Sequence, residues 1–157
     1  ASAHTPFDTT GETMTAAEPP RSPSAYPHQI TERLRFGDTD MQGHVNNAVF
    51  ATLFESGRVA FLYDPEHGLP PEGTQFVIAE LTVRFERELM FPGDVLVASG
   101  VSRIGNTSMT LGQALFAGDQ RVATAHSVIV LTDLKTRKST PLPDAARARF
   151  EALAIDA

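Results

Sequence analysis

The chain contains no cysteine among its 157 residues. Disulfides, thiolate zinc sites and a cysteine nucleophile are therefore excluded, while a reducing compartment is merely allowed. Long hydrophobic runs are also missing, because no apolar stretch approaches the roughly 20 residues that a membrane-spanning helix requires. The N-terminal residues lack the basic and apolar regions of a secretory signal. These absences predict a soluble, cytoplasmic protein without a membrane partner.

Positive charge is scarce in this sequence. Lysine and arginine together number 13, against 19 aspartate and glutamate residues, which gives a net charge of −6. This balance argues against a nucleic-acid partner, but it leaves room for a local basic patch that holds one phosphorylated ligand. The length and the 41% hydrophobic content fit a single domain with a real core.

Residues 1–27 differ in composition from the rest of the chain. They are rich in Pro, Thr, Ser, Ala and Glu, and prolines at positions 19, 20, 23 and 27 interrupt any periodicity. We therefore predict a disordered, mobile tail over residues 1–27 and a folded domain over residues 28–154.

The folded part contains one long stretch with helical periodicity among several with strand periodicity. Apolar residues recur at helical spacing over 49–61, and Asp64-Pro65 ends this helix. Alternation with a period of two predicts strands at residues 28–36, 77–86, 95–103, 108–116 and 122–131. Gly105-Asn106 and Gly118-Asp119 are hairpin signals, and residues 144–153 are typical of a terminal helix capped by Asp144. This order predicts an α+β fold in which an antiparallel sheet of about five strands covers one central helix.

A cluster of polar, turn-prone residues directly precedes the long helix. Its members are Asp38, Asp40, Gly43, His44, Asn46 and Asn47, and either asparagine suits the helix N-cap. The sequence thus places carboxylates beside the positive end of a helix dipole and its free backbone N–H groups. This combination suits chemistry on a carbonyl group, because a base and hydrogen-bond donors lie together.

The two aspartates also have simpler interpretations. Asp38, Asp40 and Gly43 match positions 1, 3 and 6 of an EF-hand loop, but position 12 is Val49 instead of the required glutamate. An Asp-x-Asp phosphatase would need a crossover α/β chain, whereas this chain has an antiparallel meander. Both aspartates would be purely structural as turn and capping acids, and local features alone favour that role.

The run over residues 38–47 resembles a motif of a known family. Hotdog-fold acyl-CoA thioesterases of the 4-hydroxybenzoyl-CoA thioesterase type carry D-x-D-x-x-G-H-V-N-N before the central helix, and often an aromatic-Glu pair followed by Arg within it. This chain has Phe54-Glu55 and Arg58 there. Later landmarks of the family occur in the right order, at residues 83–85, 92–94, 103–108 and 140–143. Phe50 and Ser56-Gly57 depart from the pattern, since Tyr and Glu-Ala are common at these positions.

The resemblance implies a sheet wrapped round the central helix and assigns the chemistry to one acid. Asp40 would be the catalytic carboxylate, either as the nucleophile that attacks the thioester carbonyl or as a general base acting on water. The oxyanion would be met by backbone N–H groups at the helix start. Asn47 is the donor that matches the family, and the residues close by are Gly43, Val45 and Asn46.

Two other polar residues keep alternative roles at this stage. His44 either braces the loop or polarises the carbonyl. Glu55 is either catalytic, as in hotdog enzymes whose acid lies on the helix, or the partner of Arg58 in an ion pair at i+3 spacing. The resemblance also implies that Phe50 and Phe54 shape the acyl pocket together with residues of a partner subunit.

Positive charges gather after the last expected strand. Lys135, Arg137 and Lys138 form either a solvated turn or a contact for CoA phosphates. Arg103 and Ser108 lie at another hairpin that would face the nucleotide. The resemblance implies an acyl-CoA substrate, no metal, no cofactor besides the CoA of the substrate, and a homodimer that pairs again into a tetramer.

Two further functions remain open beside an acyl-CoA thioesterase. Hotdog hydratases and dehydratases pair Asp and His across four intervening residues near Asn-Pro, whereas three residues separate Asp40 from His44 and no Asn-Pro occurs. A non-catalytic acyl-CoA-binding protein of the same fold would not need the acid, the glycine and the helix-start donors together. Their joint presence favours an enzyme.

Overall fold

The computed structural model of the protein describes residues 18–156. The strands are β1 (His28–Arg33), β2 (Thr74–Phe85), β3 (Asp94–Ile104), β4 (Ser108–Ala117) and β5 (Gln120–Asp133). The helices are α1 (Asn47–Leu62) and α2 (Asp144–Ala152), with 3₁₀ turns η1 (Pro23–Ala25), η2 (Phe36–Asp38) and η3 (Pro65–His67). Neither α-helix in the described part has the length and hydrophobicity of a membrane-spanning segment.

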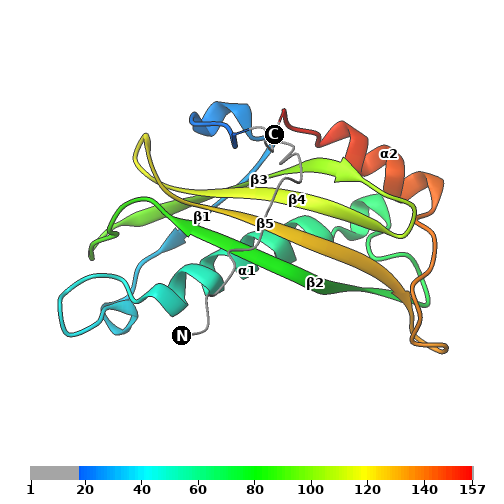
Figure 1. Cartoon of the computed structure of the whole chain (residues 1–157), viewed down its shortest axis with the longest axis horizontal. Helices are drawn as coiled ribbons and strands as arrows, with labels where there is room; N and C mark the ends of the chain where they lie inside the picture. The colour runs from blue at the N-terminus through cyan, green and yellow to red at the C-terminus, as the bar shows by residue number, and fades with distance from the viewer. Residues whose placement is uncertain (1–17, 157) are drawn as a thin grey trace, which may run out of the picture.

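The strands form one antiparallel sheet in the order β1-β3-β4-β5-β2 (Figure 1). The short connections from β3 to β4 and from β4 to β5 make the meander that the two Gly-containing hairpin signals predict. β2 does not pair with the next strand along the chain. It pairs with β5 at the far side, from Thr74↔Asp133 to Phe85↔Ala123. β1 and β2 are therefore the edge strands of the described sheet.

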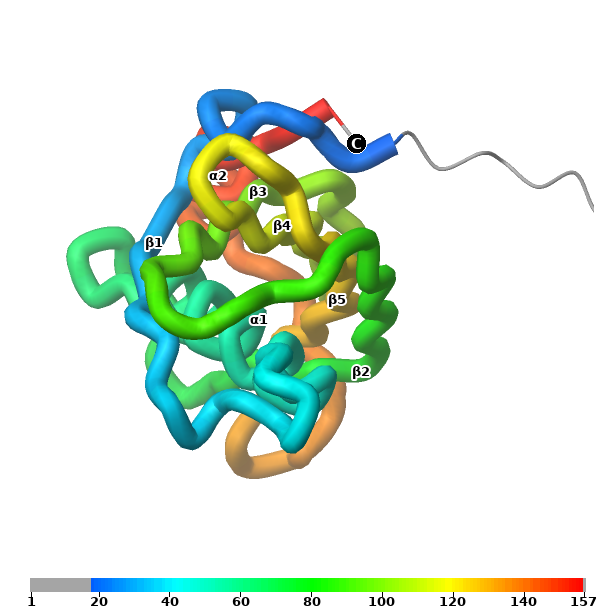
Figure 2. Tube along the Cα trace, turned by 90° about the vertical axis from the view of Figure 1, so that its left-hand side faces the viewer, coloured from blue at the N-terminus to red at the C-terminus, as the bar shows by residue number. Residues whose placement is uncertain are grey.

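Helix α1 lies along one face of the sheet, which curves round it (Figure 2). The helical period correctly places Phe50, Leu53, Phe54 and Phe61 on the buried face. Each large apolar side chain contributes about 1.5–3 kcal/mol when it is fully removed from water. The helix is also tied to β4 by Gln113, whose Nε2 donates to the carbonyl oxygen of Phe54 at 3.1 Å. This is the predicted α+β arrangement of a sheet around one central helix.

Some details at the helices differ from the sequence-based prediction. Ala60 is exposed although it belongs to the apolar stretch 49–61, whereas Leu62, the residue after that stretch, is buried. The reason is the chain after α1, which folds back so that Leu69 packs in the same cluster as Leu62. The N-cap of α2 is Pro143, and Asp144 is instead the first helical residue, where its charge still suits the helix dipole.

A close approach between α1 and the sheet occurs at Gly57. A Cβ atom on this residue would lie 2.5 Å from Cγ1 of Val97 and 2.8 Å from Nε2 of Gln113. Val97 is fully buried on β3, and Gln113 is held by its hydrogen bonds to Phe54 and Ser99. Neither neighbour can move aside easily, so glycine is required where the family pattern commonly has alanine.

We therefore expect Gly57→Ala to destabilise the protein despite the better helix propensity of alanine. The propensity gain is about 1 kcal/mol, whereas overpacking a well-packed core costs about 1–3 kcal/mol, which leaves a net loss of up to roughly 2 kcal/mol. Urea unfolding followed by circular dichroism measures this change. Gly37→Ala is the matched control, since nothing lies within 4 Å of a Cβ there. Unchanged stability in Gly57→Ala would mean that the helix shifts to make room.

Residues 18–27 lie against the outer face of the sheet, where composition alone predicted part of a mobile tail. Tyr26 is 3% exposed and packs edge-on against Phe116 of β4, with ring centroids 6.0 Å apart. Ile155, which follows α2, joins the same buried cluster. Composition missed this contact because a single aromatic residue anchors an otherwise proline-rich segment. The rest of the predicted tail, residues 1–17, lies outside the described residues, as does Ala157.

Candidate active site

The two aspartates before α1 have different environments. Asp38 is 5% exposed, and its carboxylate accepts hydrogen bonds from the backbone N–H of Arg35 and from the Arg35 guanidinium, each at 2.8 Å. The bonds from Arg35 lower the pKa of Asp38 below its usual value. Its carbonyl oxygen accepts from the N–H of Asn46 at 2.9 Å. Asp38 therefore has the structural role of a turn acid and braces the loop.

Asp40 is exposed and lines a cleft at the start of α1. Its Oδ1 accepts hydrogen bonds from the backbone N–H groups of Gln42 at 2.8 Å and His44 at 3.2 Å. Its Oδ2 receives no hydrogen bond from any residue in the described part of the chain. One carboxylate oxygen is thus fixed by the backbone and the other is free to react. This is the arrangement that a nucleophile or a general base needs.

Backbone hydrogen bonds close the loop that carries Asp40. The Asp40 N–H donates to the carbonyl oxygen of His44 at 2.8 Å, and the Gly43 N–H donates to that of Asp40 at 3.1 Å. Gly43 has a φ of 80°, a conformation that is strained for any residue with a side chain. Gly43 therefore contributes the shape of the loop.

Most backbone N–H groups of the loop already donate hydrogen bonds within the protein, so fewer of them than predicted are available to an oxyanion. The N–H of Val45 donates to the carbonyl oxygen of Leu89 at 2.8 Å, and those of Gly43, His44 and Asn46 bond within the loop. The side chain of Asn46 caps α1 by accepting from the N–H of Ala48 at 3.0 Å. This identifies the N-cap as Asn46. The donor that remains is Asn47, whose backbone N–H has no acceptor within residues 18–156 and whose residue lines the cleft.

The opposite wall of the cleft comes from residues 85–89, which are the last residue of β2 and the four residues after it. His44 forms an isolated bridge with Met90, and its Nε2 lies 3.2 Å from Oε2 of Glu88. This contact fixes the imidazole ring, so the bracing role of His44 has a structural basis. The cleft has a volume of about 410 Å³ and is lined by Asp40, Gln42, His44, Val45, Asn47, Phe50, Phe85, Glu86, Arg87, Glu88 and Leu89.

Sequence reasoning missed most of this wall. The alternation of residues predicts that a strand ends at Glu86, and it gives no role to Arg87, Glu88 and Leu89. These residues reach the cleft only because β2 pairs with β5 at the edge of the sheet and ends beside the loop that carries Asp40. The sole local signal was the resemblance at residues 83–85, which marks the end of the strand but no role for the residues after it.

The two predicted pocket phenylalanines have different positions. Phe50 is 2% exposed, borders the cleft and packs edge-on against Phe85 with ring centroids 5.2 Å apart. Phe54 is fully buried in the core between α1 and the sheet, and it does not line the cleft.

Glu55 lies outside the Asp40 cleft. Together with Arg58 it lines a second groove, of about 320 Å³, between α1 and the middle of β2. Arg58 is 9% exposed, and its Nη1 has no hydrogen-bond partner in the part of the chain that the structure describes. Burial lowers the pKa of Arg58, and the nearby charge of Glu55 opposes this shift. The structure thus separates the two candidate acids into two different grooves.

The predicted CoA-binding residues lie at the other end of the sheet. Lys135, Arg137 and Lys138 are exposed in the loop after β5, and Arg103 and Ser108 lie at the hairpin between β3 and β4. Both loops are beyond the C-terminal end of α1, whereas Asp40 is before its N-terminal end (Figure 1). A helix of 16 residues is roughly 24 Å long, so these groups do not form one compact site within the chain. No cluster of three or more potential metal ligands occurs within residues 18–156.

Comparisons with known proteins agree with this fold. The sequence profile of the Thioesterase-like superfamily matches residues 34–150. A thioesterase from Thermus thermophilus, complexed with coenzyme A and zinc, is 30% identical with a TM-score of 0.71, covering 82% of this chain and 95% of that one. A predicted thioesterase from Bacillus stearothermophilus is 28% identical with a TM-score of 0.75, and the match covers 83% of this chain and 98% of that one.

A more distant structure supports the fold alone. A protein from Pseudomonas aeruginosa has a TM-score of 0.77 at 24% identity, with 87% of this chain and 97% of that chain covered. No match was found among curated proteins.

Proposed function

Because the chain belongs to the Thioesterase-like superfamily, we propose that it is an enzyme that hydrolyses an acyl-CoA thioester to the free acid and CoA. The observation that carries the proposal is Asp40, whose carboxylate is fixed through one oxygen beside the N-terminus of α1. A protein that only bound acyl-CoA would not need an acid held in this way. The Thermus thermophilus structure with bound coenzyme A supports CoA as the thiol part of the substrate.

The geometry suits a thioester whose carbonyl oxygen points to the start of α1. The free N–H of Asn47 and the helix dipole would stabilise the negative charge that develops on this oxygen. As a nucleophile, the free oxygen of Asp40 bonds to the carbonyl carbon, the C–S bond breaks and CoA leaves as a thiolate; water then hydrolyses the anhydride. As a general base, Asp40 takes a proton from the attacking water and returns it to the departing thiolate.

A panel of acyl-CoA substrates tests this function directly. Short, long and aromatic acyl-CoAs would be incubated with the protein, and free thiol would be followed with a colorimetric thiol reagent. The protein has no cysteine, so the reagent reports only the CoA that is released. We expect steady turnover of at least one class. Binding of CoA without thiol release from any thioester would identify a non-catalytic binding protein instead.

The proposal includes a homodimer, because the Asp40 cleft and the basic loop of one chain lie far apart. β2 begins beside the basic loop, where Thr74 pairs with Asp133, and it ends at the cleft, where Phe85 is a wall residue. A second copy paired antiparallel along β2 would therefore bring its own basic loop to the Asp40 cleft. Such pairing also removes the unpaired backbone groups of an open edge strand.

The exposed side chains of β2 support this choice of edge. Large apolar residues that are one third to one half exposed lie on β2 and on the neighbouring face of α1, and they are Val59, Val77, Ile78, Leu81 and Phe85. A partner placed over β2 would cover them together with the groove that contains Glu55. The basic residues Arg137 and Lys138 would then contact CoA phosphates held mainly by the other subunit.

We expect a dimer with no active monomer at micromolar concentration in sedimentation velocity.

A mixing experiment tests the shared site. One variant carries Asp40→Asn, and the other carries Arg137→Ala with Lys138→Ala. If subunits exchange at random and each site uses both chains, about a quarter of all sites regain Asp40 and both basic residues. These sites should turn over with the KM of the unmodified protein. Activity with only the raised KM of the basic-loop variant would show that each site belongs to one chain.

A further inference from the structure

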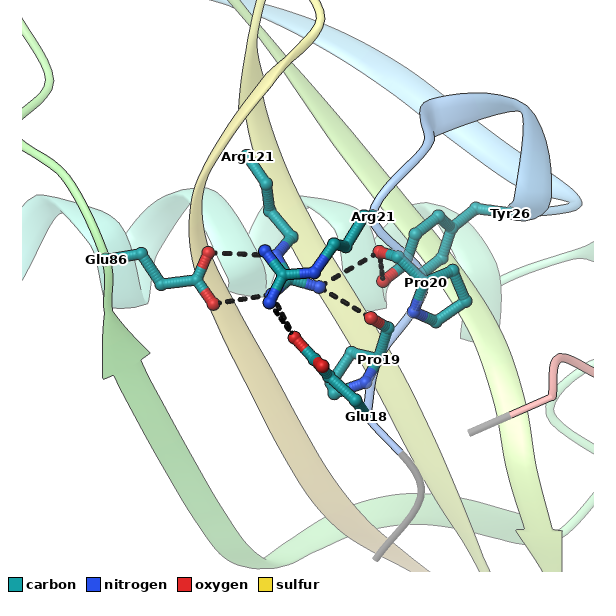
Figure 3. Close-up of polar contacts among 7 residues, drawn as sticks. All are labelled: Glu18, Pro19, Pro20, Arg21, Tyr26, Glu86 and Arg121. Carbon is teal, nitrogen blue, oxygen red and sulfur yellow. Dashed lines mark hydrogen bonds and ion pairs between the residues drawn. The ribbon is translucent and has the colours of Figure 1, made fainter.

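Arg121, near the start of β5, is the centre of a polar cluster on the outer side of the sheet (Figure 3). The residue is 7% exposed, and its guanidinium makes two bonds to Glu86, from Nε at 2.9 Å and from Nη2 at 2.7 Å. Nη1 donates to the carbonyl oxygens of Pro19 and Pro20, and Nη2 donates to Oε1 of Glu18. Each of the five N–H groups of the guanidinium therefore has an acceptor. These acceptors belong to two segments that are far apart in the sequence.

The first segment is the wall of the candidate active site. The backbone N–H groups of Glu86 and Arg87 both donate to the carbonyl oxygen of Val122, at 2.9 and 3.0 Å, directly beside Arg121. Two residues further on, Glu88 contacts His44 at 3.2 Å. The ion pair between Arg121 and Glu86 thus fixes the near end of a short segment whose far end contacts the loop that carries Asp40.

The second segment, residues 18–26, is here called the N-terminal arm. Its anchor is Tyr26, which packs against Phe116 and whose hydroxyl group donates to the carbonyl oxygen of Pro20 at 3.0 Å. Burial raises the pKa of Tyr26 to about 12, so the hydroxyl group stays a neutral donor at physiological pH. The same Pro20 carbonyl accepts from Arg121, so the anchor and the guanidinium share an acceptor.

We propose that Arg121 is a positioning residue through which the N-terminal arm sets the geometry of the cleft wall at residues 85–89. Residues outside the cleft would then tune how well it holds a substrate. The identity of that substrate rests on the proposed function, but the coupling between arm and wall does not. Loosening the arm should loosen the wall and weaken substrate binding, while Asp40 keeps its own hydrogen bonds within the loop.

Hydrogen exchange measured by mass spectrometry tests the coupling without any assay of activity. Arg121→Ala should raise amide exchange about tenfold or more in peptides covering residues 84–90 and in the arm, since several charge-assisted bonds are lost. Tyr26→Phe is the gentler variant, because it removes one hydroxyl group and leaves both Arg121 and Glu86 in place. It should still raise exchange at residues 84–90. Faster exchange in the arm with an unchanged wall would overturn the proposal.

A matched control separates positioning from general destabilisation. Arg149 is also a partly buried arginine paired with an acid, Asp64 at 3.1 Å, but it lies on α2 at the other end of the sheet. Arg149→Ala should leave exchange at residues 84–90 unchanged. Equal responses of the wall to Arg121→Ala and Arg149→Ala would contradict a specific role for Arg121.

The kcat and KM of the variants on a confirmed substrate provide a second test. Arg121→Ala should raise KM several-fold with kcat changed less than about twofold, because the wall holds the ground state and the transition state alike. Arg121→Lys keeps the positive charge but lacks the planar guanidinium group, so its KM should lie between that of Arg121→Ala and that of the unmodified protein. A fall in kcat with KM unchanged would reject positioning of the wall. If the wall responds in exchange but no thioester is hydrolysed, the coupling stands and the proposed function fails.

Discussion

Asp40→Asn is expected to leave the protein folded and to lower kcat by at least about 10²-fold on a confirmed acyl-CoA substrate. The amide oxygen of asparagine can still accept the hydrogen bonds that Gln42 and His44 donate to Oδ1. The loop should therefore keep its shape. The substitution removes the negative charge and the basicity of the free oxygen, which both proposed mechanisms require. Thiol release gives kcat, and thermal unfolding gives the melting temperature.

Two paired variants make the result specific to Asp40. Glu55→Gln should change kcat by less than about twofold, because Glu55 lies in a different groove. Asp38→Asn should lower the melting temperature, because a buried carboxylate that accepts hydrogen bonds from three N–H groups of Arg35 loses its charge. Near-normal turnover in Asp40→Asn would remove this residue from the mechanism. Loss of turnover in Glu55→Gln alone would place the chemistry in the groove along β2.

Arg137→Ala combined with Lys138→Ala is expected to raise KM for acyl-CoA by about 5- to 30-fold and to change kcat little. Both side chains are exposed, so each contact with a CoA phosphate contributes about 0.5–1 kcal/mol at low salt. These contacts are remote from the thioester and bind ground state and transition state alike. Initial rates at several substrate concentrations, at roughly 20 mM and roughly 200 mM salt, separate KM from kcat and show the screening of the charges.

The control for this pair is Arg33→Ala, which also removes an exposed positive charge, but from β1, the edge of the sheet opposite the β2 edge where the partner is proposed to pair. A similar rise in KM in the control would point to the overall charge of the protein instead of a local contact. A KM that stays unchanged in the double variant at low salt would return Lys135, Arg137 and Lys138 to the role of a solvated turn.

Local patterns in the sequence were enough to identify the elements of the fold. The spacing of Phe50, Phe54 and Phe61 defines a helix with one buried face, because only a period of 3.6 places them together. The alternation of apolar and polar residues located all five strands to within a few residues. The polar run before α1 also marked the site. Gly43 is required by a positive φ, and Asn46 by the N-cap, and both requirements are local.

Tertiary structure decided which residues face the loop that carries Asp40. The different roles of Asp38 and Asp40 come from local contacts, because Arg35 bonds to Asp38 at i+3 spacing whereas one oxygen of Asp40 stays free. Residues 85–89 become a wall because β2 crosses to the far edge of the sheet and pairs with β5, a strand distant in the sequence, which no local pattern encodes.

The sequence by itself therefore determined the helix, the strands, the family resemblance and the loop in which Asp40 lies, since these depend on neighbours within a few residues. Only the tertiary structure placed Glu55 in a separate groove, carried the basic loop to the opposite end of α1 and laid the N-terminal arm across the sheet. The physical reason is that each of these features depends on contacts between segments distant in the chain. Hydrophobic periodicity shows that a face is buried, but it does not show which segment covers that face.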